Sequence, residues 1–284
     1  MKNEILLSAA QLNNLIHQGD CLVVDCRFDF ADAGKGRSDW LAGHVPGAVY
    51  AHLDDHLAAP VQPHTGRHPL PAAETFAEFL ASLGWSGDQL LVAYDGGSNA
   101  IAARLWWMMR YFGQSAALLD GGFQEWSRAG FAIERGEAVG KLSPRENLTG
   151  NPRMTASADY IGECLGSERA VVLDARAAER YSGEVEPLDS RGGHIPGALN
   201  RPFTENLDAS GRFKQPLALR AEFQSFLGNT KPAKVIHSCG SGVTACHNLF
   251  AMQLAGLETS LLYPGSWSHW IRDPARPVAI GAEP

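Results

Sequence analysis

The sequence of 284 residues has no run of 18 or more apolar residues, so it predicts no membrane-spanning helix. Basic residues are also in the minority, with 24 lysines and arginines against 31 aspartates and glutamates and a formal charge of −7. This acidic balance argues against a large nucleic-acid-binding surface. The first residues, Met1 to Glu4, lack the basic-then-apolar pattern of a signal peptide. We therefore expect a soluble cytoplasmic protein with no membrane and no nucleic-acid partner.

Cysteine is scarce: the chain has five, an odd number scattered along its length. This pattern does not indicate a disulfide framework and favours a reducing compartment. The cysteines and histidines also lack the paired spacing of a zinc site, so we expect no metal and no other cofactor. Hydrophobic residues make up 45% of the chain, enough for a buried core, and the length predicts two domains or one large one.

The two halves of the chain repeat each other. Four pairs of segments correspond: Val23–Arg27 with Val172–Arg176, Gly43–Ala48 with Gly193–Ala198, Asp95–Ser98 with Cys239–Gly242, and Trp126 with Trp270. The last two pairs share an offset of 144, so no gap lies between them. We therefore predict domains at 1–138 and 150–284, joined by a linker near 136–152 that glycine and proline punctuate.

Short apolar runs alternate with longer helical patterns in both halves. The predicted strands are Cys21–Asp25, Leu90–Tyr94, Ala116–Leu119, Ala170–Asp174, Lys234–Ser238 and Ser260–Tyr263. The predicted helices are Ser8–His17, Ala73–Leu83, Ala100–Phe112, Ser157–Leu165, Leu217–Leu227 and Thr244–Ala255. This alternation predicts an α/β fold of two tandem domains, each a mostly parallel sheet flanked by helices.

One junction between a strand and a helix carries a cysteine, Cys239, followed by Gly240, Ser241 and Gly242. The two glycines allow positive φ, which turns main-chain N–H groups inward to form an anion-binding nest. The following helix adds its positive N-terminal end, and such a nest favours the thiolate of a cysteine at its mouth. The alternative is that Cys239 is a small buried hydrophobe at a tight turn, which is how we interpret Cys246.

The segment Cys239–Ala245 resembles the active-site loop of the rhodanese superfamily, and its Gly-Ser-Gly-Val-Thr continuation resembles the 3-mercaptopyruvate sulfurtransferases. The resemblance covers nearly the whole chain, including both Gly-His-Val/Ile-Pro-Gly-Ala motifs and Trp106-Trp107. It implies a tandem rhodanese-like protein whose first domain lacks the cysteine, with Asp95 in that place. It also implies a persulfide formed on Cys239.

The resemblance further implies substrate-binding residues. Arg180 aligns with an arginine that would hold the carboxylate of the donor. A second arginine is expected slightly downstream, where the stretch Leu188–Arg191 stands, and Arg191 is the candidate for that role from a shifted position. Around the sulfur we expect contacts from Gly240, Gly242, Val243 and Thr244. Arg27 and Arg176, in the repeated Asp-x-Arg element, are interpreted as structural.

A proton relay is also implied by the resemblance. Ser241 would supply the loop hydroxyl, while His68 and Asp54 from the N-terminal half would supply the imidazole and the carboxylate. The chemistry calls for it because breaking the C–S bond of mercaptopyruvate leaves an enolate that must be protonated. His56 and His64 remain alternatives to His68.

The leading hypothesis is a sulfurtransferase that moves sulfur from 3-mercaptopyruvate through a Cys239 persulfide to a thiol, a thioredoxin-like protein or cyanide, releasing pyruvate. Thiosulfate as the donor is the alternative. A phosphatase is a second class, but it needs an arginine where Ala245 stands. A non-catalytic scaffold is a third class, which the intact Cys239 loop disfavours.

Overall fold

The computed structural model describes residues 4–138, 140, 142–258 and 260–284, so Met1 to Asn3 of the start considered above lie outside it. The chain forms two compact units. The first comprises Met1–Ala59, Leu70–Asn151 and Ala209–Phe213, and the second comprises Pro60–Pro69, Pro152–Asp208 and Lys214–Pro284. The loop Pro60–Pro69 therefore packs with the second unit, although it precedes most of the first in sequence. The domain boundaries at 1–138 and 150–284 stay a prediction.

The first unit is built on a five-stranded parallel sheet in the order β1-β5-β4-β2-β3. Its strands are β1 (Leu6–Leu7), β2 (Cys21–Asp25), β3 (Val49–Tyr50), β4 (Leu90–Tyr94) and β5 (Ala116–Leu119). Its helices are α1 (Ala9–Gln18), α2 (Lys35–Ala42), α3 (Leu53–His56), α4 (Ala73–Leu83), α5 (Ala102–Tyr111) and α6 (Gly122–Arg128). Apart from Asp25 at the end of β2, the central strands β2, β4 and β5 are apolar, as is typical of parallel sheets covered on both faces.

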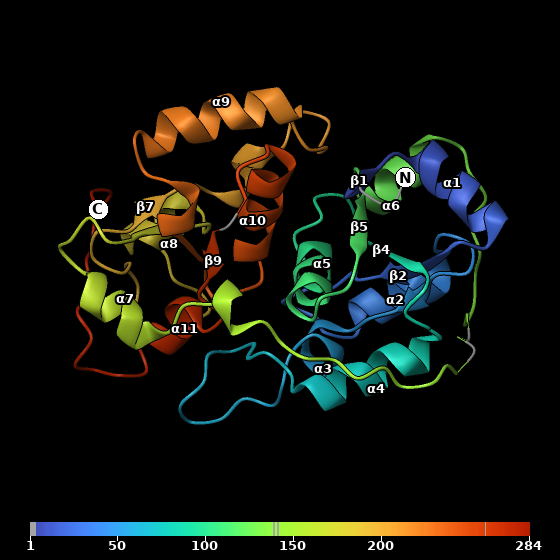
Figure 1. Cartoon of the computed structure of the whole chain (residues 1–284), viewed down its shortest axis with the longest axis horizontal. Helices are drawn as coiled ribbons and strands as arrows, with labels where there is room; N and C mark the ends of the chain where they lie inside the picture. The colour runs from blue at the N-terminus through green and yellow to red at the C-terminus, as the bar shows by residue number, and fades with distance from the viewer. Residues whose placement is uncertain (1–3, 139, 141, 259) are drawn as a thin grey trace. The chain divides into compact units, whose positions relative to one another are not determined.

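Two helix layers enclose this sheet (Figure 1). On one face, Leu12 and Leu15 of α1 and Trp126 of α6 pack with Val23 and Val92 of the sheet in one buried cluster. On the other face α5 contacts β4 and β5. All residues of α5 from position 102 to 109 are buried, including Arg104, whose guanidinium donates to the Leu57 carbonyl.

The second unit has a four-stranded parallel sheet in the order β7-β6-β8-β9. Its strands are β6 (Val171–Asp174), β7 (Leu199–Asn200), β8 (Val235–Ser238) and β9 (Leu261–Leu262). Its helices are α7 (Ala158–Cys164), α8 (Ala178–Ser182), α9 (Pro216–Leu227), α10 (Ala245–Leu254) and α11 (Ser266–Trp270), with short 3-10 turns at Pro152–Met154, Phe203–Asn206 and Pro232–Lys234. Helices α7 and α11 share one core with the sheet, and α10 packs on β8, β9 and α9 (Figure 1).

The repeat seen in the sequence recurs as a repeated set of hydrogen bonds. In the first unit Arg27 Nη2 donates to Asp25 at 2.6 Å and to the Gly43 carbonyl at 2.7 Å. In the second unit the corresponding nitrogen of Arg176 donates to Asp174 and to the Gly193 carbonyl, both at 2.7 Å. Both arginines therefore tie the end of a strand to the Gly-His turn, which confirms their structural interpretation.

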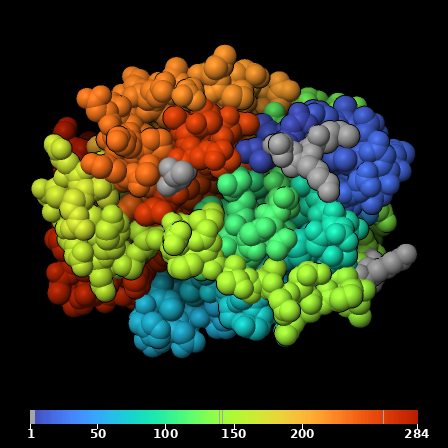
Figure 2. Space-filling model, viewed as in Figure 1, coloured from blue at the N-terminus to red at the C-terminus, as the bar shows by residue number. Residues whose placement is uncertain are grey.

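The sequence predicted β2, β4, β5 and α4 with the bounds observed, and the other long elements within two residues of theirs. It missed the two-residue strands β1, β3 and β7 and the helices α2, α3, α6, α8 and α11. These elements are too short for a hydrophobic period to emerge. The described residues of 137–151 contain no helix or strand, while Pro152, at the end of the predicted linker 136–152, begins a 3-10 turn; Figure 2 shows this yellow-green segment on the surface. No helix in the described part of the chain is both long and apolar enough to span a bilayer.

His237 lies in the middle of the second sheet and is fully buried. Its Nε2 lies 3.2 Å from the Ser260 hydroxyl, and its Nδ1 has no hydrogen-bond partner among the described residues. Burial lowers the pKa of His237 to about 3, so the folded protein holds a neutral imidazole at this position.

Folding stability should therefore fall as the pH drops below about 6.5, the ordinary pKa of histidine. The unfolded chain then binds a proton at His237 that the folded protein does not bind until the pH approaches 3. Relative to His237→Asn, the wild-type free energy of unfolding should fall by about 1.4 kcal/mol per pH unit between pH 6 and 4. Urea denaturation at several pH values measures this slope. His17→Asn, at an exposed helix position, is the control, and parallel curves for His237→Asn and wild type would contradict the account.

Candidate active site

Cys239 is the residue that follows β8, and only 2% of it is exposed. Its main chain is fixed on both sides. The Cys239 N–H donates to the Ser266 hydroxyl at 3.1 Å, and that hydroxyl donates to the Tyr263 carbonyl at 2.9 Å. The Cys239 carbonyl accepts the Trp267 N–H at 3.0 Å. The end of β8 and the start of α11 thus hold the cysteine in one position.

The loop after Cys239 turns back toward its sulfur. The Gly242 N–H donates to Cys239 Sγ at 3.1 Å. Gly242 adopts φ +79°, and a Cβ at this position would lie 2.4 Å from the Pro264 carbonyl oxygen. Only glycine meets both demands without strain. The loop continues through buried Val243 and half-buried Thr244 into α10, whose N-terminal end faces the same turn.

Gly240 serves a different purpose from the one predicted. Its φ does not lie in the left-handed region, so the expectation that both glycines supply positive φ is correct for Gly242 and wrong for Gly240. A Cβ on Gly240 would instead lie 2.9 Å from Arg67 Nη2 and 3.5 Å from Arg180 Nη2. The missing side chain therefore makes room for two guanidinium groups beside the cysteine.

His68 and Ser241 form a buried pair, with 2.7 Å between His68 Nδ1 and Ser241 Oγ. Both belong to the second unit: Ser241 lies within Lys214–Pro284, and His68 lies in the loop Pro60–Pro69, which packs with that unit. Gly66 allows this close packing, since a Cβ on it would lie 2.5 Å from the Gly265 carbonyl oxygen. Asp54 lies in α3 of the first unit, so its part in the relay stays a prediction.

The two alternative histidines are placed differently. His64 is exposed on the loop. His56 Nδ1 accepts the His52 N–H at 2.8 Å, and the His56 ring stacks on Phe79 with 4.5 Å between ring centroids. Burial lowers the pKa of His56.

Arg180 is held by two buried carboxylates. Its Nη2 donates to Glu186 at 2.7 Å and lies 3.4 Å from Asp189. Arg67 forms a short ion pair with the same Asp189. The role predicted for Arg191 stays untested: the residue is exposed, and its carbonyl accepts the Trp267 indole N–H at 2.8 Å.

Sequence reasoning assigned no role to Arg67, Glu186 or Asp189. The one signal in the sequence is that Arg67 directly precedes His68. Its partner Asp189 lies 122 positions away, a distance that only tertiary structure closes.

Arg176 is the most buried arginine near Cys239, and it forms ion pairs with Asp174 and Glu186. Its guanidinium carbon lies 4.9 Å from the centroid of the Trp267 ring, within cation–π range. Burial alone would lower the pKa of Arg176, but Asp174 and Glu186 more than offset that effect, so the pKa stands above its ordinary value. Arg176 thus stays a fixed cation whose charge its neighbours balance.

The matching loop of the first unit has a carboxylate in place of the thiol. The Asp95 carbonyl accepts the Phe123 N–H at 2.8 Å, as the Cys239 carbonyl accepts that of Trp267 at 3.0 Å. The two loops are therefore built on the same main-chain bonds. This supports the alignment of Asp95 with the nucleophile position.

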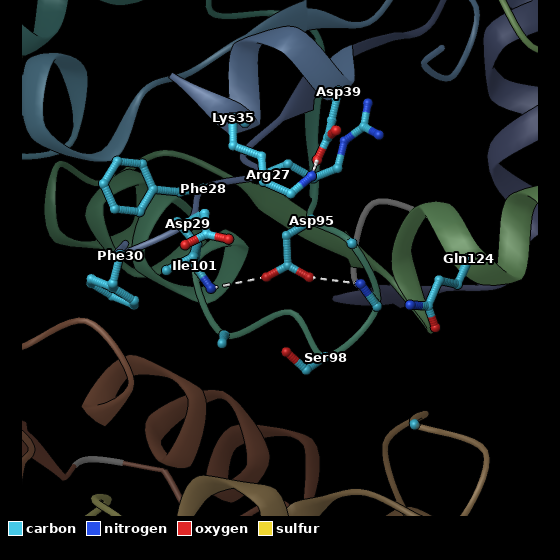
Figure 3. Close-up of a pocket in the computed structure, with 15 residues that line it drawn as sticks. Arg27, Phe28, Asp29, Phe30, Lys35, Asp39, Asp95, Ser98, Ile101 and Gln124 are labelled. Atoms are coloured by element: carbon cyan, nitrogen blue, oxygen red, sulfur yellow. Dashed lines mark hydrogen bonds and ion pairs between the residues drawn. The ribbon is translucent and has the colours of Figure 1, made fainter. Parts of the chain in front are cut away.

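The Asp95 side chain folds into its own loop (Figure 3). Its oxygens accept N–H groups from Gly97 at 3.0 Å, Asn99 at 2.8 Å and Ile101 at 2.9 Å. Burial raises the pKa of Asp95, and these amide bonds lower it; the net change is upward. The carboxylate forms part of the lining of a cavity of about 520 Å³. The N–H groups of this loop, which could bind an anionic ligand, thus bind the carboxylate of Asp95 instead.

A metal centre is not evident in the described part of the chain, where no three or more histidines, cysteines, aspartates or glutamates are grouped as ligands. All five cysteines are free thiols. The groups around Cys239 that can act chemically include the thiol, the main-chain amide of Gly242, the Ser241–His68 pair and the arginines.

The Rhodanese-like domain family matches residues 8–129 and 157–273. The chain therefore belongs to the rhodanese family, with one domain of this kind in each half. It is 44% identical to the "Probable 3-mercaptopyruvate sulfurtransferase" of Pseudomonas aeruginosa, over 99% of this chain and 100% of that protein. It is 36% identical to the "Putative thiosulfate sulfurtransferase SseB" of Mycobacterium tuberculosis, over 99% and 98%. The crystal structure of SseA from Escherichia coli, described among 3-mercaptopyruvate sulfotransferases, superposes with a TM-score of 0.81 at 33% identity, covering 94% of this chain and 100% of that chain.

Gly242 and Gly240 should respond differently to alanine. Gly242→Ala forces a strained φ and a clash with main chain, so it should lower the free energy of unfolding by about 1–3 kcal/mol. Gly240→Ala should cost less than about 1 kcal/mol, because the atoms it meets are the ends of flexible arginine side chains. Urea denaturation measures both values. Gly162→Ala in α7, where a Cβ meets open space, is the control, and equal costs for the two loop variants would contradict the geometry.

Proposed function

We propose that this protein is a sulfurtransferase that takes sulfur from 3-mercaptopyruvate and passes it on through a persulfide on Cys239. The contact of the Gly242 amide with Cys239 Sγ, at the end of β8, is the observation that carries the proposal. An N–H group aimed at sulfur stabilises negative charge on it, both as a thiolate before the transfer and as a persulfide after it. The relatives named for this activity support the same donor.

In the first half-reaction, the Cys239 thiolate attacks the sulfur of 3-mercaptopyruvate. An S–S bond forms, the C–S bond breaks, and the electron pair of that bond goes to carbon as the enolate of pyruvate. The proton of the donor's thiol ends on this carbon, which gives pyruvate and a Cys239 persulfide anion. The Ser241–His68 pair supplies the path for that proton, with Asp54 as the carboxylate that orients the imidazole.

In the second half-reaction, an acceptor attacks the outer sulfur of the persulfide and releases the Cys239 thiolate. A thiol acceptor leaves as its persulfide, and cyanide leaves as thiocyanate. A thioredoxin-like protein would provide such a thiol. The five free cysteines suit a reducing compartment, so we place the enzyme in the cytoplasm.

The charges around the cysteine favour 3-mercaptopyruvate over thiosulfate. Three guanidiniums and three carboxylates form one connected group: Arg67, Arg176, Arg180, Asp174, Glu186 and Asp189. Their formal charges cancel, so the group offers little excess positive charge to a dianion such as thiosulfate. A donor with a single carboxylate, such as 3-mercaptopyruvate, needs less excess positive charge for binding than the dianion thiosulfate does. Thiosulfate remains the second candidate donor because of the name of the mycobacterial relative.

Replacing the nucleophile tests the mechanism. Cys239→Ser should abolish pyruvate release from 3-mercaptopyruvate, because the remaining hydroxyl cannot form a persulfide. After donor treatment the wild-type protein should gain the mass of one sulfur atom on the peptide that contains Cys239. Cys246→Ser, a buried position in α10, is the matched control and should keep the added sulfur. Sustained pyruvate release by Cys239→Ser would sink the proposal.

Comparing donors tests the substrate. With cyanide as the common acceptor, kcat/KM for 3-mercaptopyruvate should exceed kcat/KM for thiosulfate by at least about 10-fold, since only one donor matches the balanced charges of the site. Thiocyanate formation reports both reactions in one assay. An equal or higher value for thiosulfate would make the alternative donor the correct one.

A further inference from the structure

The loop Pro60–Pro69 brings an arginine as well as a histidine to the second unit. The Arg67 N–H donates to the Ser268 hydroxyl of α11 at 3.0 Å, directly after the close packing of Gly66 on Gly265. His68 then pairs with Ser241. Arg67 is therefore fixed at its main chain on both sides, so its side chain projects from a defined point.

The guanidinium groups of Arg67 and Arg180 converge on the same spot. An ideal Cβ on Gly240 would lie 2.9 Å from Arg67 Nη2, and 3.5 and 3.6 Å from the two terminal nitrogens of Arg180. Gly240 directly follows Cys239. Two planar cations thus lie beside the residue that directly follows the nucleophile.

The carboxylates that hold these arginines are more buried than the arginines themselves. The side chains of Glu186 and Asp189 are 6% and 5% exposed, against 19% for Arg180 and 25% for Arg67. Asp189 contacts both guanidiniums. In addition, the buried Nε of Arg180 has no hydrogen-bond partner among the described residues. A guanidinium has five N–H donors, so each arginine keeps donors beyond those that the carboxylates take.

We propose that Arg67 is a second donor-binding residue, whose guanidinium acts together with that of Arg180 to bind the carboxylate of the sulfur donor. The proposal rests on the proposed function, because it requires a donor that carries a carboxylate. Two converging guanidiniums bind a carboxylate through several charge-assisted hydrogen bonds and fix its orientation. Arg67 thereby fills the place for which the sequence offered only Arg191, an exposed residue.

The experiment uses Arg67→Gln in the full chain, with 3-mercaptopyruvate as donor. Removing one charged partner of the carboxylate should lower kcat/KM about 10- to 100-fold. The loss should lie mainly in KM, because the carboxylate is bound alike before and during sulfur transfer. The inhibition constant of pyruvate, which carries the same carboxylate, should rise in the same proportion. Arg169→Gln, an exposed arginine of the same unit, is the control and should match wild type.

Several outcomes would overturn the role of Arg67. They are an unchanged kcat/KM, a loss confined to kcat, or a higher KM with an unchanged inhibition constant for pyruvate. The last two would mean that Arg67 acts on the His68 loop rather than on the carboxylate. Should Arg67→Gln not fold, Arg67→Lys replaces it: lysine keeps the charge but loses the planar fork, so both constants should rise together, and unchanged constants overturn the proposal. Failure of the proposed function is distinct, since wild type itself would then release no pyruvate.

Discussion

The site depends on one main-chain amide, that of Gly242, which donates to the sulfur of Cys239 at 3.1 Å. This contact exists because the loop between β8 and α10 reverses within three residues. The reversal requires the positive φ of Gly242 and its close approach to the Pro264 carbonyl. The core of the second unit holds both walls of the loop: β8 lies between β6 and β9 in the sheet, and α11 binds the main chain of Cys239 through Ser266. The packing of β8, Pro264 and α11 around the loop thus fixes the position of the sulfur.

The first unit shows what the same loop does without a thiol. The Asp95 carbonyl accepts a main-chain N–H from α6, as the Cys239 carbonyl does from α11. The Asp95 carboxylate, however, accepts N–H groups from its own loop. An anion that belongs to the chain occupies the donors that a nest would offer to a ligand. The repeat therefore preserved the scaffold, the Asp-x-Arg clamp and the buried tryptophans. Of the two corresponding loops, the one after β8 carries the thiol and the one after β4 carries a carboxylate.

Much of the fold followed from the sequence because the central strands are apolar runs and the long helices have clear periods. Cys239 was found because a cysteine between a strand and a helix, in a glycine-rich loop, forms a local pattern. Gly240 and Arg67 could not be understood in this way. Gly240 matters for two guanidiniums that come from positions 67 and 180, and no local pattern encodes that meeting. Residues gathered by loop packing escape arguments from spacing, since their spacing varies freely.

The loop Pro60–Pro69 links the two tasks of the site. It carries Arg67, which we assign to the donor's carboxylate, and His68, which we assign to its proton, on adjacent residues. Because Gly66 and Ser268 anchor the loop to α11, and α11 also binds the main chain of Cys239, the nucleophile, His68 and Arg67 share one support, while Arg180 comes from α8. The positions of these three side chains relative to one another therefore depend on the packing of α11. Sulfur transfer depends on these relative positions, because attack at sulfur and protonation at carbon take place on the same small molecule, whose carboxylate fixes where both atoms lie.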